Sequence, residues 1–130
     1  MTRRPVILVT RRLDPASHQR MSRDYEAVLN ETDKSFSSDE LAKLCQHVDG
    51  VIACNGEQFS AKVISEFPPR MRVIACSTYS AGMVDLEAAR SVGVIVTHSG
   101  DPSLSPQDAS RTLDAVDAVF KGYAPPDRLA

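Results

Sequence analysis

Residues Arg72 to Ser99 read RVIACSTYSAGMVDLEAARSVGVIVTHS. The apolar runs at 73–76 and 94–97 predict two strands, and the segment from about Met83 to Val92 predicts a helix that stops at Gly93. This is a β-α-β unit, the usual connection between two parallel strands. The small-residue turn at 77–82 follows the carboxyl end of the first strand, where open α/β sheets bind their ligands. We therefore expect any functional site to lie at this turn.

The rest of the chain continues the alternation of strands and helices. Further strands are expected at 5–10, at 26–31, which is shorter and more polar, and at 51–55. Further helices are expected from Asp14-Pro15 to about Asp24, from the capping-box pair Ser37 and Glu40 to Asp49-Gly50, after Ser60 up to Pro68-Pro69, and from Ser105-Pro106 to Gly122. The tail up to Ala130 is expected to be frayed or to lie on the surface.

These elements predict one domain over residues 1–130. The fold class is α/β: a flavodoxin-like three-layer α/β/α sandwich with a five-stranded parallel sheet in the order 2-1-3-4-5, and the polar strand 26–31 lies at an edge. A net charge of -2 is not that of a nucleic-acid binder, and no apolar run is long enough for a membrane span. The three cysteines, Cys45, Cys54 and Cys76, have no metal-type spacing and indicate buried free thiols in a reducing cytoplasm.

The usual cofactor motifs of this fold are missing from the sequence. There is no G-x-G-x-x-G turn and no P-loop. The loop from Thr10 to Asp14 has one hydroxyl, no glycine and two arginines, which disfavours a flavin phosphate site. A two-component receiver would need acidic residues, an aspartate and a lysine where Thr10-Arg11, Asn55 and His98 stand. His98 ends a strand at the ligand edge, where we favour a structural role over that of an acid, a base or a ligand. His18 and His47 are expected on the surface of helices.

The turn at 77–82 has two interpretations. Exposed backbone N–H groups of a serine- and glycine-containing turn at a helix start can bind a carboxylate or phosphate. The alternative is a structural turn in which Ser80 caps the following helix. Asp85 and Glu87 follow it, where negative charge complements the helix dipole.

Several segments together resemble one family. They are VILVTRRL at 6–13, DGVI at 49–52, the serine-x-glycine Ser80-Ala81-Gly82, LEAAR at 86–90 with Gly93-Val94, LDAVDAVFKG at 113–122 and PPDR at 125–128. In this order they resemble the D-2-hydroxyacid dehydrogenases, in particular the glyoxylate and hydroxypyruvate reductase branch, and they cover nearly the whole chain.

The resemblance implies a discontinuous substrate domain whose two parts are joined directly. Residues 1–99 correspond to its first part and 100–130 to its closing helix and tail, so that the inserted NAD(P)-binding Rossmann domain is absent between them. The family's catalytic arginine and glutamate are absent together with that domain. Pro106-Gln107 stands where the family has its proline-histidine pair. Glutamine cannot act as the general acid of hydride transfer. We therefore expect no catalytic residue, no cofactor-binding residue and no metal site.

Two functions follow from the resemblance. The first, which we favour, is an isolated and engineered substrate domain, or alternatively a natural degenerate paralogue, that is not an enzyme by itself. The second is a weak binding module for a 2-oxo or 2-hydroxy acid, or one half of a split NAD(P)-dependent enzyme. In it the vestigial loop Ser80, Ala81 and Gly82 would hold the substrate carboxylate through backbone N–H groups, although this loop is about two residues shorter than the family's. We expect a monomer that can self-associate through the surface left by the missing domain, and neither a nucleic-acid nor a membrane partner.

Overall fold

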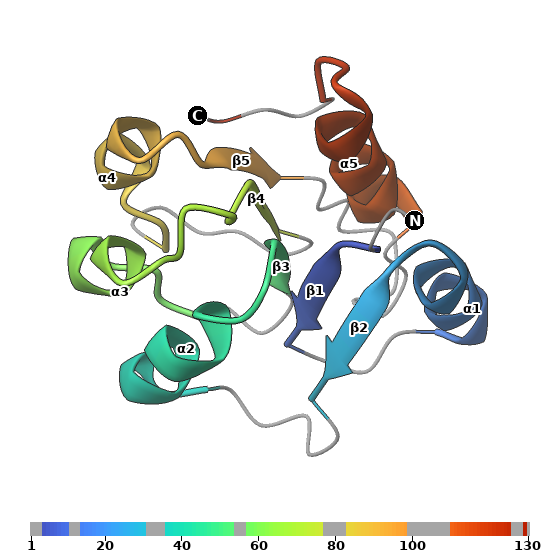
Figure 1. The fold of residues 1–130 in the computed structure, drawn as a ribbon, viewed down its shortest axis with the longest axis horizontal. Helices are drawn as coiled ribbons and strands as arrows, with labels where there is room; N and C mark the ends of the chain where they lie inside the picture. Colours follow the sequence, from blue (N-terminus) through green and yellow to red (C-terminus); the bar gives the residue numbers. More distant parts are fainter. Residues whose placement is uncertain are drawn as a thin grey trace.

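The computed structural model describes residues 4–10, 14–30, 36–53, 57–76, 83–98, 110–125 and 129 of the 130-residue chain. Strands and helices alternate strictly along it (Figure 1). The elements are β1 (Val6–Val9), α1 (Pro15–Asp24), β2 (Glu26–Leu29), α2 (Ser38–Cys45), β3 (Gly50–Ala53), α3 (Ala61–Ser65), β4 (Val73–Cys76), α4 (Leu86–Ser91), β5 (Ile95–His98) and α5 (Ser110–Lys121). None of the helices described is long and apolar enough to cross a bilayer.

The five strands form one parallel sheet in the order β2-β1-β3-β4-β5. This confirms the expected flavodoxin-like order, with the more polar β2 at one edge. All strands run in the same direction, so their amino ends lie along one side of the sheet and their carboxyl ends along the opposite side. We call these two sides the amino edge and the carboxyl edge.

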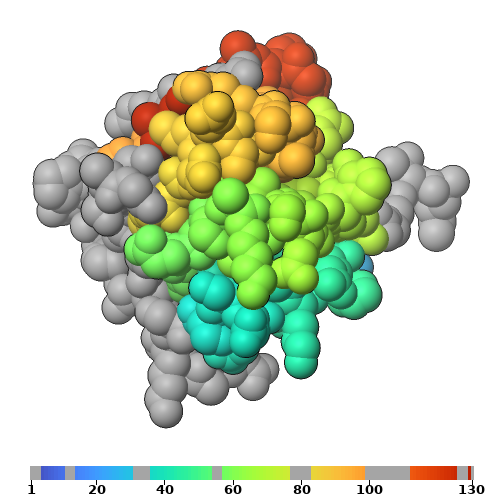
Figure 2. All heavy atoms as spheres, turned by 90° about the vertical axis from the view of Figure 1, so that its left-hand side faces the viewer, coloured from blue at the N-terminus to red at the C-terminus, as the bar shows by residue number. Residues whose placement is uncertain are grey.

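Helices cover both faces of the sheet, as expected for parallel strands. On one face α1 and α5 pack on Ile7, Val9, Ile52, Val73 and Ala75. On the other, α2, α3 and α4 pack on the alternate strand residues Leu8, Val51, Ala53, Ile74, Cys76 and Val96. Figure 2 shows these three helices side by side across that face. Two apolar layers therefore hold the sheet, one on each side.

Gly50 has a different role from the one expected. The sequence predicts that Asp49-Gly50 stops the second helix, but α2 ends earlier, at Cys45, and Gly50 is the first residue of β3. A Cβ on Gly50 would lie 2.8 Å from Val73 Cγ1 and 3.1 Å from Ile7 Cδ1. The glycine is therefore required by the close packing of side chains from the neighbouring strands.

The predicted helix starts are confirmed where they rest on local caps. The Asp14 carboxylate accepts from the Ser17 N–H at 3.2 Å, with Pro15 next to it at the first helical position. Ser37 and Glu40 form the complete capping box of α2. Ser60 caps α3 through the Val63 N–H at 3.3 Å. The predicted start of the last helix at Ser105-Pro106 lies outside the described residues.

Polar contacts fasten the closing helix α5 to α1. The Arg20 guanidinium lies 2.7 Å from Asp114 Oδ1 and 2.6 Å from Asp117 Oδ2. The Tyr25 hydroxyl donates to Asp117 Oδ1, and its ring lies 6.0 Å from the Phe120 ring. Burial, followed by this bond to a carboxylate, raises the pKa of Tyr25. Helix α5 is thus an integral part of the fold.

Two described residues near the end of the chain, Gly122 and Leu129, show how α5 ends and where part of the tail lies. Gly122, at φ +80°, ends α5 as predicted. Of the tail, Leu129 is described: its N–H donates to Val96 O at 2.7 Å, and its half-buried side chain packs against the core layer under α2, α3 and α4. Leu129 therefore partly covers the outer edge of β5.

Candidate functional site

The carboxyl edge of the sheet, where the sequence places the site, has a buried polar rim. Thr10 and Asn30, which follow β1 and β2, are both buried, and Asn30 Nδ2 donates to Thr10 O at 2.8 Å. Glu57, four residues beyond β3, is only 2% exposed. A buried carboxylate at this edge was not expected from the sequence. The feature of the sequence that could have indicated a buried Glu57 is its position shortly after a buried strand and directly after a glycine.

The residues predicted to bind a substrate carboxylate, Ser80, Ala81 and Gly82, lie outside the described residues. The described residues do define both ends of this loop. It leaves β4 at Cys76, which is fully buried, and it returns at Met83, which is 1% exposed. Both ends of the loop are therefore fixed in the core.

The exit of the loop is held by a short parallel bridge between Phe59 and Val84. The Phe59 N–H donates to Met83 O at 2.8 Å, and the Asp85 N–H donates to Phe59 O at 2.9 Å. Val84 and Asp85 are therefore extended. The expected helix from about Met83 accordingly begins only at Leu86.

The same bridge corrects the expected helix cap. The N-cap of α4 is Asp85, whose carboxylate accepts from the Ala88 N–H at 3.0 Å, and not Ser80. Asp85 and Glu87 thus act at the helix start as predicted. Residues 83–85 separate Gly82 from α4, so the N–H groups of the predicted loop are not those of the helix terminus.

Two buried polar atoms at this edge lack a hydrogen-bond partner: Asp14 Oδ1, which follows β1, and Thr97 Oγ1 in β5. Thr97 is fully buried and pairs with Ala75 of β4, one residue before the strand end. Unsatisfied buried polar atoms are uncommon and often mark the place of a ligand or a water molecule. The Thr97 hydroxyl is therefore the described group that best supports a ligand near the end of β4.

The histidines and cysteines form no cluster in the described part of the chain. His98 ends β5 and is half-buried, whereas His18 and His47 are exposed, His47 in the turn after α2. Cys45 is a buried free thiol, as expected, Cys76 is buried, and Cys54 lies outside the described residues. Burial raises the pKa of the Cys45 thiol to about 12. Among described residues there is no group of three or more side chains that could hold a metal ion.

Comparison with known proteins agrees with this fold. Residues 7–109 match the family model described as D-isomer specific 2-hydroxyacid dehydrogenase, catalytic domain. A glyoxylate reductase of Thermococcus onnurineus is 24% identical over 98 residues, which are 75% of this chain and 29% of that protein. The chain thus spans less than a third of this relative's length.

Solved structures show the same arrangement. A putative D-isomer specific 2-hydroxyacid dehydrogenase from Polaromonas superposes with a TM-score of 0.68 at 23% identity, over 75% of this chain and 31% of the other. D-mandelate dehydrogenase from Rhodotorula graminis superposes with a TM-score of 0.57 at 18% identity, over 92% of this chain and 36% of the other. A match over 92% of the chain must extend beyond β5 into the residues that include α5. By its family match and its fold, the chain belongs to the D-isomer specific 2-hydroxyacid dehydrogenases, as a form of their catalytic domain.

Proposed function

We propose that this chain is a self-sufficient substrate-domain fold that does not catalyse hydride transfer by itself. The observation that carries the proposal is internal to the chain. Strand β5 ends at His98 and α5 begins at Ser110, and only residues 99–109 lie between them. A nucleotide-binding domain needs on the order of 100 residues, so none can be inserted at this point.

The family implies NAD(P), and the described residues do not fit that cofactor. A dinucleotide pyrophosphate binds at an open helix N-terminus behind a glycine-rich turn. The first turn of α1 instead holds the Asp14 carboxylate and Pro15, which has no N–H to offer. Side chains likewise cap α2, α3 and α4. We derive no reaction step through the cofactor.

The direct junction of β5 to α5 is, in this proposal, engineered, and a natural degenerate paralogue is the alternative. The full burial of Leu113, Ala115 and Val116 supports a fold in which α5 packs directly on the sheet without an inserted domain. In the described part, the exposed large apolar side chains are Leu29, Val92 and Tyr123, which belong to β2 and to the turns after α4 and α5. They support a monomer, with self-association as the alternative. The buried free thiol of Cys45 supports a reducing, cytoplasmic setting.

The test is a turnover assay with purified, folded chain. The chain is mixed with NADH or NADPH and with glyoxylate or hydroxypyruvate, and coenzyme absorbance is followed, with a complete glyoxylate reductase as the positive control. We expect no oxidation above the buffer rate. Saturable oxidation that scales with the concentration of the chain would refute the proposal.

A second candidate function is weak binding of a 2-oxo or 2-hydroxy acid, and the unsatisfied Thr97 hydroxyl is the observation that favours it. In this case the backbone N–H groups of Ser80, Ala81 and Gly82 would receive the carboxylate, and the Thr97 hydroxyl would donate to it from the neighbouring strand. A ligand held from one side only should bind with roughly millimolar affinity. A separate nucleotide-binding chain could then complete a split enzyme.

This candidate is tested by titrating the chain with oxalate and following the NMR chemical shifts of the backbone amides of Ser80 to Gly82. Saturable shifts that weaken in Thr97→Val, and that persist in Thr112→Val as a second buried threonine, would support it. Absence of shifts at millimolar oxalate would exclude it. Turnover on adding the separately expressed nucleotide-binding domain of a relative would support the split enzyme.

A further inference from the structure

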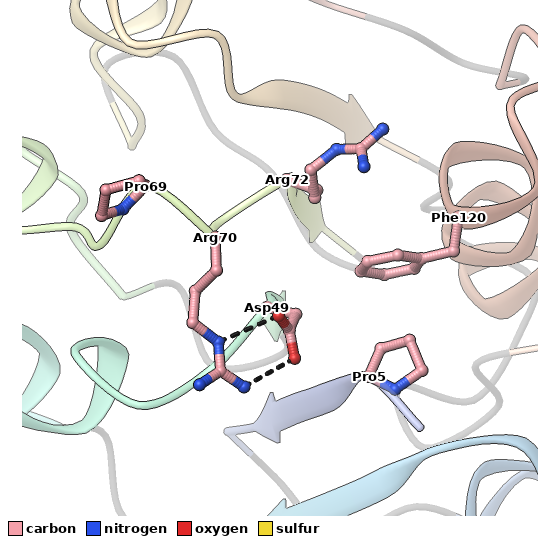
Figure 3. A pocket seen from close by; sticks show the side chains of 6 residues that line it. All are labelled: Pro5, Asp49, Pro69, Arg70, Arg72 and Phe120. Carbon is pink, nitrogen blue, oxygen red and sulfur yellow. Dashed lines mark hydrogen bonds and ion pairs between the residues drawn. The ribbon is translucent and has the colours of Figure 1, made fainter. Parts of the chain in front are cut away.

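A second candidate site lies at the amino edge of the sheet, opposite the predicted loop. An open hollow of about 390 Å³ is lined by Pro5, Asp49, Pro69, Arg70, Arg72 and Phe120 (Figure 3). These residues precede β1, β3 and β4 or, for Phe120, belong to the last turn of α5. Its volume is within the usual range of small-molecule sites.

Among the described residues that line the hollow, the one acidic side chain, Asp49, is already engaged. Asp49 Oδ1 and Oδ2 each lie 2.9 Å from a nitrogen of Arg70, and Oδ2 also accepts from the Val6 N–H at 2.7 Å. The Asp49 side chain is 11% exposed. Its charge is therefore largely neutralised within the wall of the hollow.

Arg72 is different from Arg70. Figure 3 shows the Arg70 side chain turned toward Asp49 and the Arg72 side chain turned away from it. Arg72 is exposed, and its guanidinium makes no side-chain hydrogen bond or ion pair with the residues that the structure describes. It therefore offers the hollow a cation whose fork of N–H donors suits a planar carboxylate.

The remaining wall is apolar. The Phe120 ring is half-buried and is supported by the Tyr25 ring, while Pro5 and Pro69 contribute their pyrrolidine rings. Two of the last carbonyls of α5 accept bonds within the helix end: the Gly122 N–H donates to Val119 O and the Tyr123 N–H donates to Ala118 O. They do not compete for the guanidinium.

We propose that this hollow binds a small aryl carboxylate, with the carboxylate on the Arg72 guanidinium and the aromatic ring against Phe120 and Pro5. A guanidinium provides the charged pair, and an aromatic ring beside it provides the apolar contact. The hollow is open and Arg72 is exposed, so the affinity is roughly millimolar. This site is independent of the predicted loop and of any hydride transfer.

Benzoate is the probe, and the amide shifts of Arg72, Val73 and Phe120 are the readout at constant ionic strength. We expect saturable shifts, and an affinity about tenfold lower in Arg72→Gln because the charge-assisted pair is lost. Arg90→Gln, an exposed arginine on α4 across the sheet, is the matched control and should leave the benzoate affinity unchanged.

Two further ligands distinguish the contribution of the carboxylate charge to binding from that of the aromatic ring. Benzamide keeps the ring without the charge, and acetate keeps the charge without the ring; each should bind about tenfold more weakly than benzoate. No saturable shift with benzoate, equal binding of benzamide or acetate, or an unchanged affinity in Arg72→Gln would each overturn the proposal. The spectrum of each variant shows whether it has remained folded.

Discussion

Asp49 is the residue through which three separate segments are tied at the amino edge of the sheet. Its carboxylate accepts from the Val6 N–H of β1 and from Arg70 in the loop before β4. Its backbone N–H donates to Val6 O at 2.7 Å, and its carbonyl accepts from the Arg72 N–H at 2.8 Å. We therefore expect Asp49→Ala to destabilise the domain.

The size of this effect follows mainly from the Val6 bond. Removing the charged acceptor of a partly buried N–H costs about 1–3 kcal/mol, while the contact with the half-buried Arg70 is partly screened by solvent and adds less. A loss of about 2 kcal/mol should lower the melting temperature of a domain of this size by roughly 6–10 °C. The Asp49→Asn variant should lose less, because its amide oxygen can still accept from Val6.

Urea unfolding followed by circular dichroism measures this loss, with Asp24→Asn as the control. Asp24 also pairs with an arginine, Arg23 at 3.2 Å, but both side chains are exposed, so its replacement should not move the midpoint. If Asp49→Ala unfolded at the same urea concentration as Asp24→Asn, the carboxylate would not be a structural tie.

Further expectations concern packing and protonation. Gly50→Ala should lower the free energy of unfolding by about 1–3 kcal/mol, measured in urea, because the new methyl group would meet Val73 Cγ1 at 2.8 Å; an unchanged midpoint would contradict the packing argument. Thr97→Val should raise the melting temperature, since it removes a buried hydroxyl without a partner, whereas a lower melting temperature would show that the hydroxyl is satisfied. The free energy of unfolding should fall above about pH 9, because the pKa values of Cys45 and Tyr25 are raised in the folded state. The unfolded chain therefore loses these two protons first as the pH rises. The stability that the two groups contribute is complete below about pH 9 and is lost above it. The urea midpoint should decline less steeply with rising pH in Cys45→Ala and Tyr25→Phe than in the unchanged chain. If the midpoints of the variants and of the unchanged chain declined equally at alkaline pH, these two groups would not cause the loss of stability.

The sequence predicts features that depend on neighbours along the chain. The capping box of Ser37 and Glu40 needs only residues three apart, and the apolar runs of the strands need only their own composition. The order of the strands also follows, because strict alternation of strands and helices permits few topologies. These predictions are confirmed.

Features that depend on tertiary contacts were not predicted. Ser80 and Asp85 are both good N-cap residues, and the bridge between Phe59 and Val84 decides in favour of Asp85. Gly50 follows a helix and so resembles a stop, but its role is set by Val73, 23 positions away. The Asp49–Arg70 pair likewise joins residues 21 positions apart, and nothing in the local pattern indicates it.

A self-sufficient domain requires that α5 and the sheet form one cooperative unit, although only residues 99–109 connect β5 to α5. Native-state hydrogen exchange of the intact chain tests this most directly. Amides in the middle of α5, such as Val116, should exchange with the same opening free energy as Ile74 of β4, and both should equal the global free energy of unfolding. If the opening free energy of α5 amides were more than about 2 kcal/mol below that of β4 amides, α5 would be a separately docked segment, and the chain would not be one self-sufficient domain.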